Sequence, residues 1–256
     1  MNTQSKVGQR NDMESYFIPQ WPVPSHIRSF VTTRCGGFSQ GNYQSFNLGL
    51  SSGDNPKDVR LNREKMQSDW DWKQPPLWVR QVHGTKVVYA SEDDHTIQAD
   101  GVWTDKQQTV CLILTADCLP VLLCHKTGSC VAAVHAGWKG LAAGVLESAL
   151  HLLPDTPDNM MAFLGPAIGP ACFEVGPEVR DTFLAEVPES EKAFIAGKGD
   201  RWQADLYHLA RLRLEKNGLT AIYGGDCCTF TEEERFYSYR RDGKLSGRIA
   251  SAIWLE

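Results

Sequence analysis

Three apolar runs lie close together in the middle of the chain, at residues 110–115, 120–125 and 130–135. They are rich in valine, isoleucine, leucine and alanine, and polar residues do not alternate with the apolar ones. Continuous runs of this length are typical of strands buried on both faces. Shorter runs predict further strands at 27–33, 77–81, 86–90, 160–164, 219–223, 236–239 and 249–254, with a hairpin or tight turn at His83-Gly84 between the second and the third.

Helical spacing appears directly after the third central run. Residues 138–153 carry Leu141, Val145 and Ala149 on one face and stop at Pro154, which predicts a single helix. A second helix is expected at 57–70, because Asp54 or Asn55 can cap it and a proline stands in its first turn. Two more helices are expected at 177–186 and 204–216.

Strands and helices are mixed along the chain without clean βαβ alternation, and no repeat or low-complexity linker interrupts them. We therefore expect an α/β chain of α+β-like character, with a mixed sheet or two packed sheets flanked by helices. Residues 16–256 are predicted to form a single catalytic domain. Residues 1–15 are polar and predict a flexible tail.

Composition narrows the classes of function. The 256 residues carry a net charge of −5, so the chain lacks the basic surface of a general nucleic-acid binder. The longest apolar stretch, residues 110–124, is too short and too polar to span a membrane. No export signal is recognisable, which predicts a cytoplasmic protein. Monomer and homodimer both remain open.

The cysteines and histidines limit the metal chemistry. Eight cysteines without a CxxC pair predict free thiols rather than a disulfide scaffold or a zinc ribbon. Seven histidines are too few for a four-copper laccase, which needs about ten imidazole ligands.

His83, Cys118 and His135 all lie at the ends of predicted strands or in turns, where ligands bind in sheet proteins. Together they could hold one zinc ion and leave a fourth position open, as catalytic zinc sites do. Their separations of 35 and 17 residues form no local metal motif. Each residue also has an ordinary interpretation: a turn histidine, a buried thiol, and a strand-end histidine bonded to the backbone.

Three further polar residues are candidates for substrate and phosphate binding. Arg34 precedes two glycines in a tight loop and could hold an oxyanion with its planar fork. Lys139 lies at the start of a predicted helix, where backbone N–H groups favour anions. Asn47 is the third candidate, although its segment Phe46-Asn-Leu-Gly-Leu50 is a weak signal by itself. The GxxxxGK[ST] pattern of a P-loop is absent.

Several segments in one order resemble a known family. They include Thr33-Arg34-Cys-Gly-Gly37, Phe46-Asn47-Leu-Gly49, Gln81-Val-His83-Gly84, Ala99-Asp100-Gly101, Thr115-Ala-Asp-Cys118-Leu-Pro120, Val134-His135-Ala-Gly-Trp-Lys-Gly140, Leu164-Gly-Pro-Ala-Ile-Gly-Pro170 and Tyr237-Ser-Tyr-Arg-Arg-Asp242. From about residue 16 onward the chain resembles the YfiH-like laccase-domain family, also described as the multicopper polyphenol oxidase type.

The resemblance implies a compact fold of sheets inside helices, related to cysteine-hydrolase-like domains, and a metal site at His83, Cys118 and His135. It implies a purine nucleoside phosphorylase acting on adenosine, inosine, guanosine or methylthioadenosine, with adenosine deaminase side activity. For such a substrate, Asn47 could hold a ribose hydroxyl or the base edge. Zinc is the expected metal and copper the alternative. The zinc-deaminase signature H-x-E…P-C-x-x-C is absent, so Asp117 or Asp100 is the candidate acid or base.

Two other functions remain open at this stage. Bacterial members of the family are also linked to peptidoglycan-precursor editing, for which Cys118 and His135 would act as a nucleophile and base in an amidase. A binding module without turnover is the third possibility. The polyphenol oxidase label fits the histidine count least.

Overall fold

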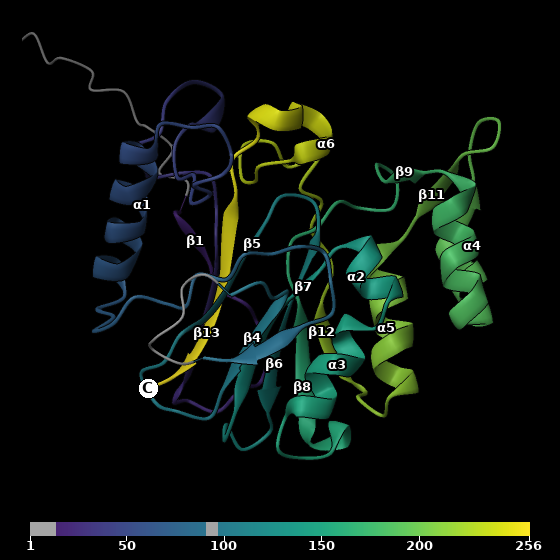
Figure 1. Cartoon of the computed structure of the whole chain (residues 1–256), viewed down its shortest axis with the longest axis horizontal. Helices are drawn as coiled ribbons and strands as arrows, with labels where there is room; N and C mark the ends of the chain where they lie inside the picture. Colours follow the sequence, from purple (N-terminus) through teal and green to yellow (C-terminus); the bar gives the residue numbers. More distant parts are fainter. Residues whose placement is uncertain (1–13, 91–96) are drawn as a thin grey trace, which may run out of the picture.

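Two β-sheets packed face to face form the centre of the structure, a computed structural model that describes residues 14–90 and 97–256 (Figure 1). The first sheet is antiparallel and has the order β1 (Tyr16–Phe17), β2 (Ile27–Thr32), β13 (Ile249–Leu255) and β5 (Cys111–Thr115). The second is mixed and has the order β12 (Ala221–Gly224), β8 (Met160–Leu164), β6 (Leu119–His125), β7 (Val131–Ala136), β4 (Gly101–Thr104) and β3 (Val87–Tyr89).

Strand β6 shows how the unbroken apolar runs are used. Leu119, Val121 and Leu123 point to the helices on one face of the mixed sheet. Leu122 and Cys124 point the other way, into the interface with the antiparallel sheet. Because successive side chains of a strand point to opposite faces, a strand covered on both sides must be apolar throughout.

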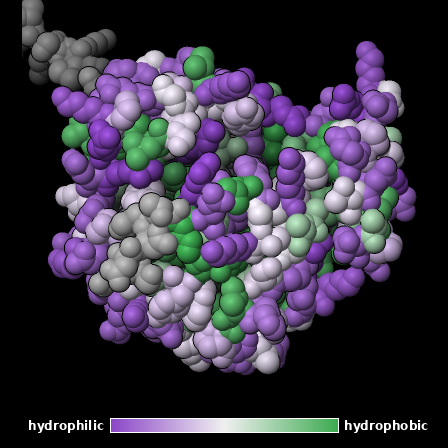
Figure 2. All heavy atoms as spheres, in the orientation of Figure 1, coloured by the Kyte–Doolittle hydropathy of each residue, from purple (hydrophilic) through white to green (hydrophobic). Residues whose placement is uncertain are grey.

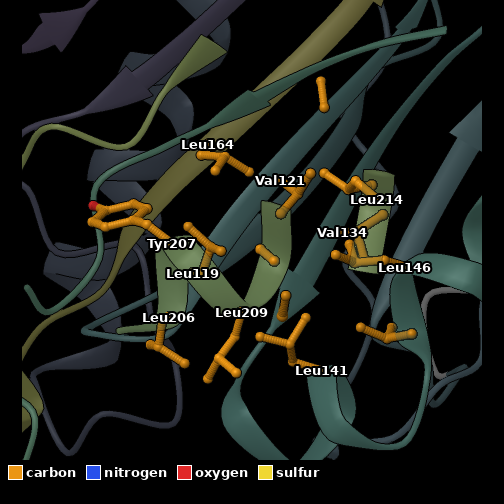
Figure 3. Close-up of a cluster of buried hydrophobic side chains, with 14 of the residues drawn as sticks. Leu119, Val121, Val134, Leu141, Leu146, Leu164, Leu206, Tyr207, Leu209 and Leu214 are labelled. Atoms are coloured by element: carbon orange, nitrogen blue, oxygen red, sulfur yellow. The ribbon is translucent and has the colours of Figure 1, made fainter. Parts of the chain in front are cut away.

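Helices cover both outer faces of the pair of sheets. Figure 3 shows the side chains that join α2 (Trp138–Ala142), α3 (Val145–Leu152) and α5 (Leu206–Lys216) to the mixed sheet. On the antiparallel sheet, α1 (Pro56–Asp69) contributes Met66 to an aromatic cluster with Phe30 and Trp254. The layers are therefore helix, sheet, sheet, helix.

Smaller elements complete the described chain. A three-stranded sheet of β10 (Phe194–Ala196), β11 (Trp202–Ala204) and β9 (Glu174–Val175) lies beside α4 (Pro177–Glu186) at one side of the molecule. Short helices are α6 (Tyr239–Asp242) and the 3-10 turns Gly41–Tyr43, Pro157–Asn159, Pro188–Ala193 and Gly243–Leu245. Hydrophilic residues cover most of the face seen in Figure 2. Within the described ranges no helix is long and apolar enough to cross a membrane.

The predicted architecture of packed sheets flanked by helices is confirmed, but two predicted strands are wrong. Residues 77–81 form a single bridge, from Arg80 to Gln98, and β3 pairs in parallel with β4, so no hairpin forms at His83. Residues 236–239 are no strand, because the buried Phe236 and Tyr237 lead directly into helix α6.

The predicted tail falls largely on residues 1–13, which lie outside the described part of the chain. The last two residues of that tail are bonded to Thr33, the residue directly after strand β2. The carbonyl oxygen of Ser15 accepts a hydrogen bond from the Thr33 N–H, and that of Glu14 accepts one from the Thr33 hydroxyl.

The single helix expected at 138–153 is also wrong, because Gly144 divides it into α2 and α3. Gly144 has φ of +94°, outside the helical region. The apolar spacing continues across the break, which is why the sequence pattern did not reveal it. The break lets both short helices lie against the mixed sheet.

We expect Gly144→Ala to destabilise the protein by about 1 kcal/mol, because a Cβ is unfavourable at positive φ. An unbroken helix would instead gain about 1 kcal/mol from the same change. Urea unfolding measures the sign of the change in the free energy of unfolding. Gly144→Asn is the matched variant and should recover part of the loss, because asparagine tolerates the left-handed region.

Candidate active site

His83, Cys118 and His135 come together although they lie in three separate segments. One ligand atom from each lies within 4.8 Å of the other two. The Cys118 Sγ is 3.8 Å from the His83 Nε2, and the two imidazole rings are nearly perpendicular, at 81°. Among the described residues, this is the one group of three or more such side chains with metal-binding spacing.

The pairing of β6 with β7 places two members of the group. Pro120 is opposite His135 in the register, and Cys118 stands two residues before Pro120 on the same face of the sheet. This face carries Leu122 and packs against the antiparallel sheet further along the strand. At the strand ends the two side chains are diagonal neighbours and point into the opening between the sheets.

Asp100 places the third member. Its carboxylate accepts hydrogen bonds from the backbone N–H groups of Val82, His83 and Gly84, at 3.3, 2.9 and 2.7 Å. His83 has φ of +60°, so its backbone is in the sparsely populated left-handed region. Three donors on one buried carboxylate hold it there.

The same carboxylate orients His135. Its Oδ1 is 2.8 Å from the His135 Nδ1, and both side chains are buried. The Nδ1 therefore donates to Asp100, which leaves the Nε2 free to bind a metal. Burial opposes ionisation of Asp100, but hydrogen bonds from His135 and Gly84 hold its pKa below the usual range.

Electrostatics favour a thiolate at Cys118. Burial raises the pKa of this thiol, but charge interactions and hydrogen bonds with His135 and His83 outweigh it and bring the pKa well below its usual range. Burial lowers the pKa of His135, and the charge of Cys118 together with Asp100 raises it overall. A thiolate and two imidazoles are ligands that suit zinc and copper.

Gly137 leaves room for the group. A Cβ at this position would lie 2.9 Å from the His83 Cδ2 and 3.0 Å from the Cys118 Sγ. Its φ of −64° is ordinary, so the glycine is needed for close approach and not for an unusual turn. The three side chains and this glycine form a compact cradle with space for one ion.

The group opens onto a cavity of ≈ 850 Å³. This volume lies in the range of small-molecule sites. Aromatic side chains of Trp138, Phe173 and Tyr239 contribute to the walls. The other lining residues are Gly49, Leu50, Ser51, Ser52, Arg63, Val79, Arg80, Gln81, His83, Leu114, Thr115, Ala116, Asp117, Cys118, His135, Ile168, Arg240 and Arg248.

The structure places two of the predicted phosphate residues away from the cavity lining. Arg34 donates from its Nε to the Gln44 carbonyl and from its Nη1 to the Glu233 carbonyl, at 3.0 and 2.9 Å. Lys139 is exposed, and its ammonium lies over the Trp138 ring. Neither side chain belongs to the lining residues.

Asn47 and Asp117 have structural partners. Asn47 is fully buried and lies behind the cavity wall. Asp117 lines the cavity, but its two carboxylate oxygens accept from the Thr229 hydroxyl and the Arg240 N–H, both at 2.6 Å. These bonds fix the backbone turn of Asp117, whose φ is +79°, directly before Cys118.

The sequence analysis missed two kinds of residue at the site. Gln81 pairs with the backbone of β5: its Nε2 donates to the Leu114 carbonyl and its Oε1 accepts from the Leu114 N–H, at 2.7 and 2.8 Å. Arg63 and Arg248 line the cavity from α1 and from the segment before β13. A lone arginine carries no motif, and only the fold brings these two to one cavity.

We expect Gly137→Ala to weaken zinc binding by about 10- to 100-fold, because the new methyl group displaces the ligands. Competition with a chromogenic chelator measures the affinity. Gly84→Ala is the matched control, because its Cβ would meet only ordinary contacts at 3.4 and 3.6 Å. Equal zinc affinity of the two variants would contradict the role given to Gly137.

In the metal-free protein, we expect iodoacetamide to alkylate Cys118 at a lower pH than an ordinary thiol, because its pKa is depressed. Peptide mass spectrometry over a pH series gives the midpoint. Cys227 is the internal reference, because burial raises its pKa to about 11. His135→Ala should move the Cys118 midpoint upward; a wild-type midpoint at or above about 8.5 would disprove the prediction.

Comparison with known proteins identifies relatives of this chain. The chain is 48% identical to the Escherichia coli (strain K12) protein named purine nucleoside phosphorylase YfiH, over 95% of this chain and 100% of the relative. It is 46% identical to a Pseudomonas aeruginosa purine nucleoside phosphorylase, again over 95% and 100%.

Solved structures agree with the sequence comparison. A Neisseria meningitidis protein superposes with a TM-score of 0.91 at 46% identity and covers 95% of this chain and 100% of its own. YlmD from Geobacillus stearothermophilus superposes with a TM-score of 0.89 at 28% identity, over 96% and 98%. Residues 28–256 match the family described as multi-copper polyphenol oxidoreductase laccase. The chain therefore belongs to this laccase-like family, together with YfiH.

Proposed function

We propose that this protein is a metal-dependent purine nucleoside phosphorylase. The observation that carries the proposal is the His83, Cys118 and His135 group at a cavity of ≈ 850 Å³. Relatives that are 44–48% identical over 93–95% of the chain bear the name purine nucleoside phosphorylase. Adenosine, inosine, guanosine and methylthioadenosine are the proposed substrates.

Phosphorolysis exchanges one bond for another at the sugar. An oxygen of inorganic phosphate forms a bond to C1′ as the bond from C1′ to the purine nitrogen breaks. The electron pair of the broken bond leaves with the purine, which takes up a proton. The products are the free base and the pentose 1-phosphate. Positive charge on the sugar develops between the two groups, so the site must hold an anion close to it.

Aromatic walls suit the purine. Trp138, Phe173 and Tyr239 line the cavity from three separate segments of the chain. Purine rings stack on aromatic side chains with little dependence on ring substituents. This supports a site that accepts several purine nucleosides. Adenosine deamination, the second proposed reaction, would use the same cavity.

Zinc held by His83, Cys118 and His135 would supply Lewis-acid polarisation of a substrate oxygen or of water. Asp100 keeps His135 in the tautomer that a metal ligand needs, and it fixes the backbone of the His83 turn. Copper is the alternative metal, since two imidazoles and a thiolate suit both ions. The seven histidines still count against a four-copper oxidase.

A second candidate is a thiol amidase that edits peptidoglycan precursors. It is favoured by the arrangement of Cys118, His135 and Asp100, in which the histidine lies between a low-pKa thiol and a buried carboxylate. Nucleophile, base and orienting carboxylate have this order in cysteine hydrolases. The two candidates differ in their need for metal, because chelation inactivates a zinc enzyme and leaves a thiolate nucleophile intact.

We expect zinc-loaded protein to release free base from inosine and adenosine only when phosphate is present. Cys118→Ala should lower this rate by more than about 100-fold, because loss of a ligand costs at least as much as loss of an outer-shell partner. Chromatography of the reaction mixture measures the base and the pentose 1-phosphate, and it detects inosine formed from adenosine by deamination.

Cys35→Ala is the matched control, because this half-buried thiol donates to the Glu234 carbonyl and lies outside the cavity lining. It should retain the wild-type rate. Absence of base release from metal-loaded wild type would refute the phosphorylase proposal. Turnover of an aminoacylated precursor that survives chelation would establish the amidase instead.

A further inference from the structure

The cavity is basic in a protein that is acidic overall. The chain has a net charge of −5, yet four arginines line the cavity: Arg63, Arg80, Arg240 and Arg248. Within the described lining, Asp117 is the one acidic residue, and its oxygens are bound to Thr229 and Arg240. A cavity of this charge attracts an anion, and a nucleoside is neutral.

Arg248 is half-buried and has unused hydrogen-bond donors. Its Nη1 donates to the carbonyl oxygens of Ser246 and Gly247, at 2.7 and 2.8 Å. Among the described residues, no carboxylate pairs with Arg248, and no protein group accepts from its Nε or Nη2. The Nε and Nη2 donors of this half-buried cation are therefore free to bind an anion in the cavity.

Arg63 is likewise a half-buried cation without a carboxylate partner among the described residues. Its Nε and Nη2 both donate to the Leu48 carbonyl, at 2.9 and 2.8 Å, and its guanidinium lies 3.5 Å from the centre of the Trp78 ring. No described carboxylate forms an ion pair with it. Burial lowers the pKa of Arg63 to about 10, so the side chain is still charged at pH 7.

Residues 47–49 hold both arginines in place. The Asn47 Oδ1 accepts from the Arg248 N–H at 2.8 Å, and the Leu48 N–H donates to the Arg248 carbonyl at 3.1 Å. The Leu48 carbonyl accepts from Arg63. A Cβ at Gly49 would lie 2.6 Å from the Arg248 Cγ. The Asn47-Leu-Gly49 motif therefore positions two guanidinium groups at one wall of the cavity.

Arg248 is also within electrostatic range of the metal group. Burial lowers the pKa of Arg248, and the negative charge of Cys118 acts in the opposite direction. An anion bound by Arg248 would thus lie in the same cavity as the three ligands. Phosphorolysis needs this proximity, because phosphate and the glycosidic bond must meet.

We propose that Arg248 and Arg63 form the binding site for the phosphate co-substrate. The inference rests on the proposed phosphorylase function and assigns its anion subsite to residues outside the sequence-predicted set. The free fork of Arg248 presents Nε and Nη2 to two phosphate oxygens, and Arg63 supplies a second positive charge. Residues 47–49 and α1 keep both groups in position before phosphate arrives.

The test separates phosphate binding from turnover. Inorganic phosphate is titrated into zinc-loaded protein by calorimetry, and KM for phosphate and for inosine are measured in parallel. We expect Arg248→Met and Arg63→Met to raise Kd and KM for phosphate by about 10- to 100-fold, the loss of a charge-assisted hydrogen bond. KM for inosine should change less than about 2-fold.

Two variants serve as controls. Arg60→Met removes an exposed arginine one turn away on the same helix as Arg63, and it should leave all constants unchanged. Arg248→Lys keeps the charge and removes the fork, so it should retain part of the affinity for phosphate. It serves as the test variant if Arg248→Met fails to fold. Urea unfolding checks that the variants are folded.

The outcomes distinguish the two proposals. If the wild type turns over nucleoside and the folded Arg248 and Arg63 variants keep its KM for phosphate, the subsite is overturned and the phosphorylase proposal stands. Failure of wild type to bind phosphate would also overturn the subsite. Phosphate binding that both variants weaken, without nucleoside turnover, would support the oxyanion subsite and refute the phosphorylase.

Discussion

The buried carboxylate of Asp100 is the interaction on which the site depends. It accepts four N–H donors: three from the backbone of the His83 turn and one from the His135 ring. An ionised carboxylate away from water costs several kcal/mol unless such donors surround it. Here the donors belong to two of the three ligand-bearing segments. The same bonds that make the charge tolerable therefore fix the distance between two ligands.

The walls of the cavity come from different layers of the fold. His135 lies at the end of β7 and Cys118 directly precedes β6, so the register of the two strands and the turn at Asp117 set their separation. Arg63 and Arg248 come from α1 and from the segment that leads into β13, on the side of the antiparallel sheet. The lining also includes Leu114 and Thr115 of β5 in the antiparallel sheet and His135 of β7 in the mixed sheet. Packing between the two sheets thus sets the distance between these parts of the wall.

The sequence allowed the framework to be predicted but only part of the site. Runs such as 120–125 are apolar throughout, and this pattern predicts buried strands without any tertiary information. The helix break at Gly144 was missed because the hydrophobic spacing continues through it. The residues at 236–239 were mistaken for a strand because aromatic residues favour strands, whereas Tyr237 is buried by contact with the distant Tyr43 carbonyl.

The metal group could be proposed from its resemblance to a family, since separations of 35 and 17 residues carry no local signal. The motif around Asn47 marked this residue as a candidate, but the sequence did not reveal its role. Asn47 accepts a hydrogen bond from a backbone N–H group 201 residues away. Arg63 and Arg248 had no signal at all, because an isolated arginine is ordinary in sequence. Only the three-dimensional structure assigns these residues to the cavity.

Strand β13 has a consequence for synthesis of the protein. It lies between β2 and β5, although more than 100 residues separate it in sequence from either neighbour. On a ribosome, β2 and β5 emerge early and must wait with their inner edges unpaired until β13 is translated. Arg248, which directly precedes β13, is added in the same step. A chain whose synthesis has not reached β13 therefore lacks Arg248, and the lining of its cavity is incomplete.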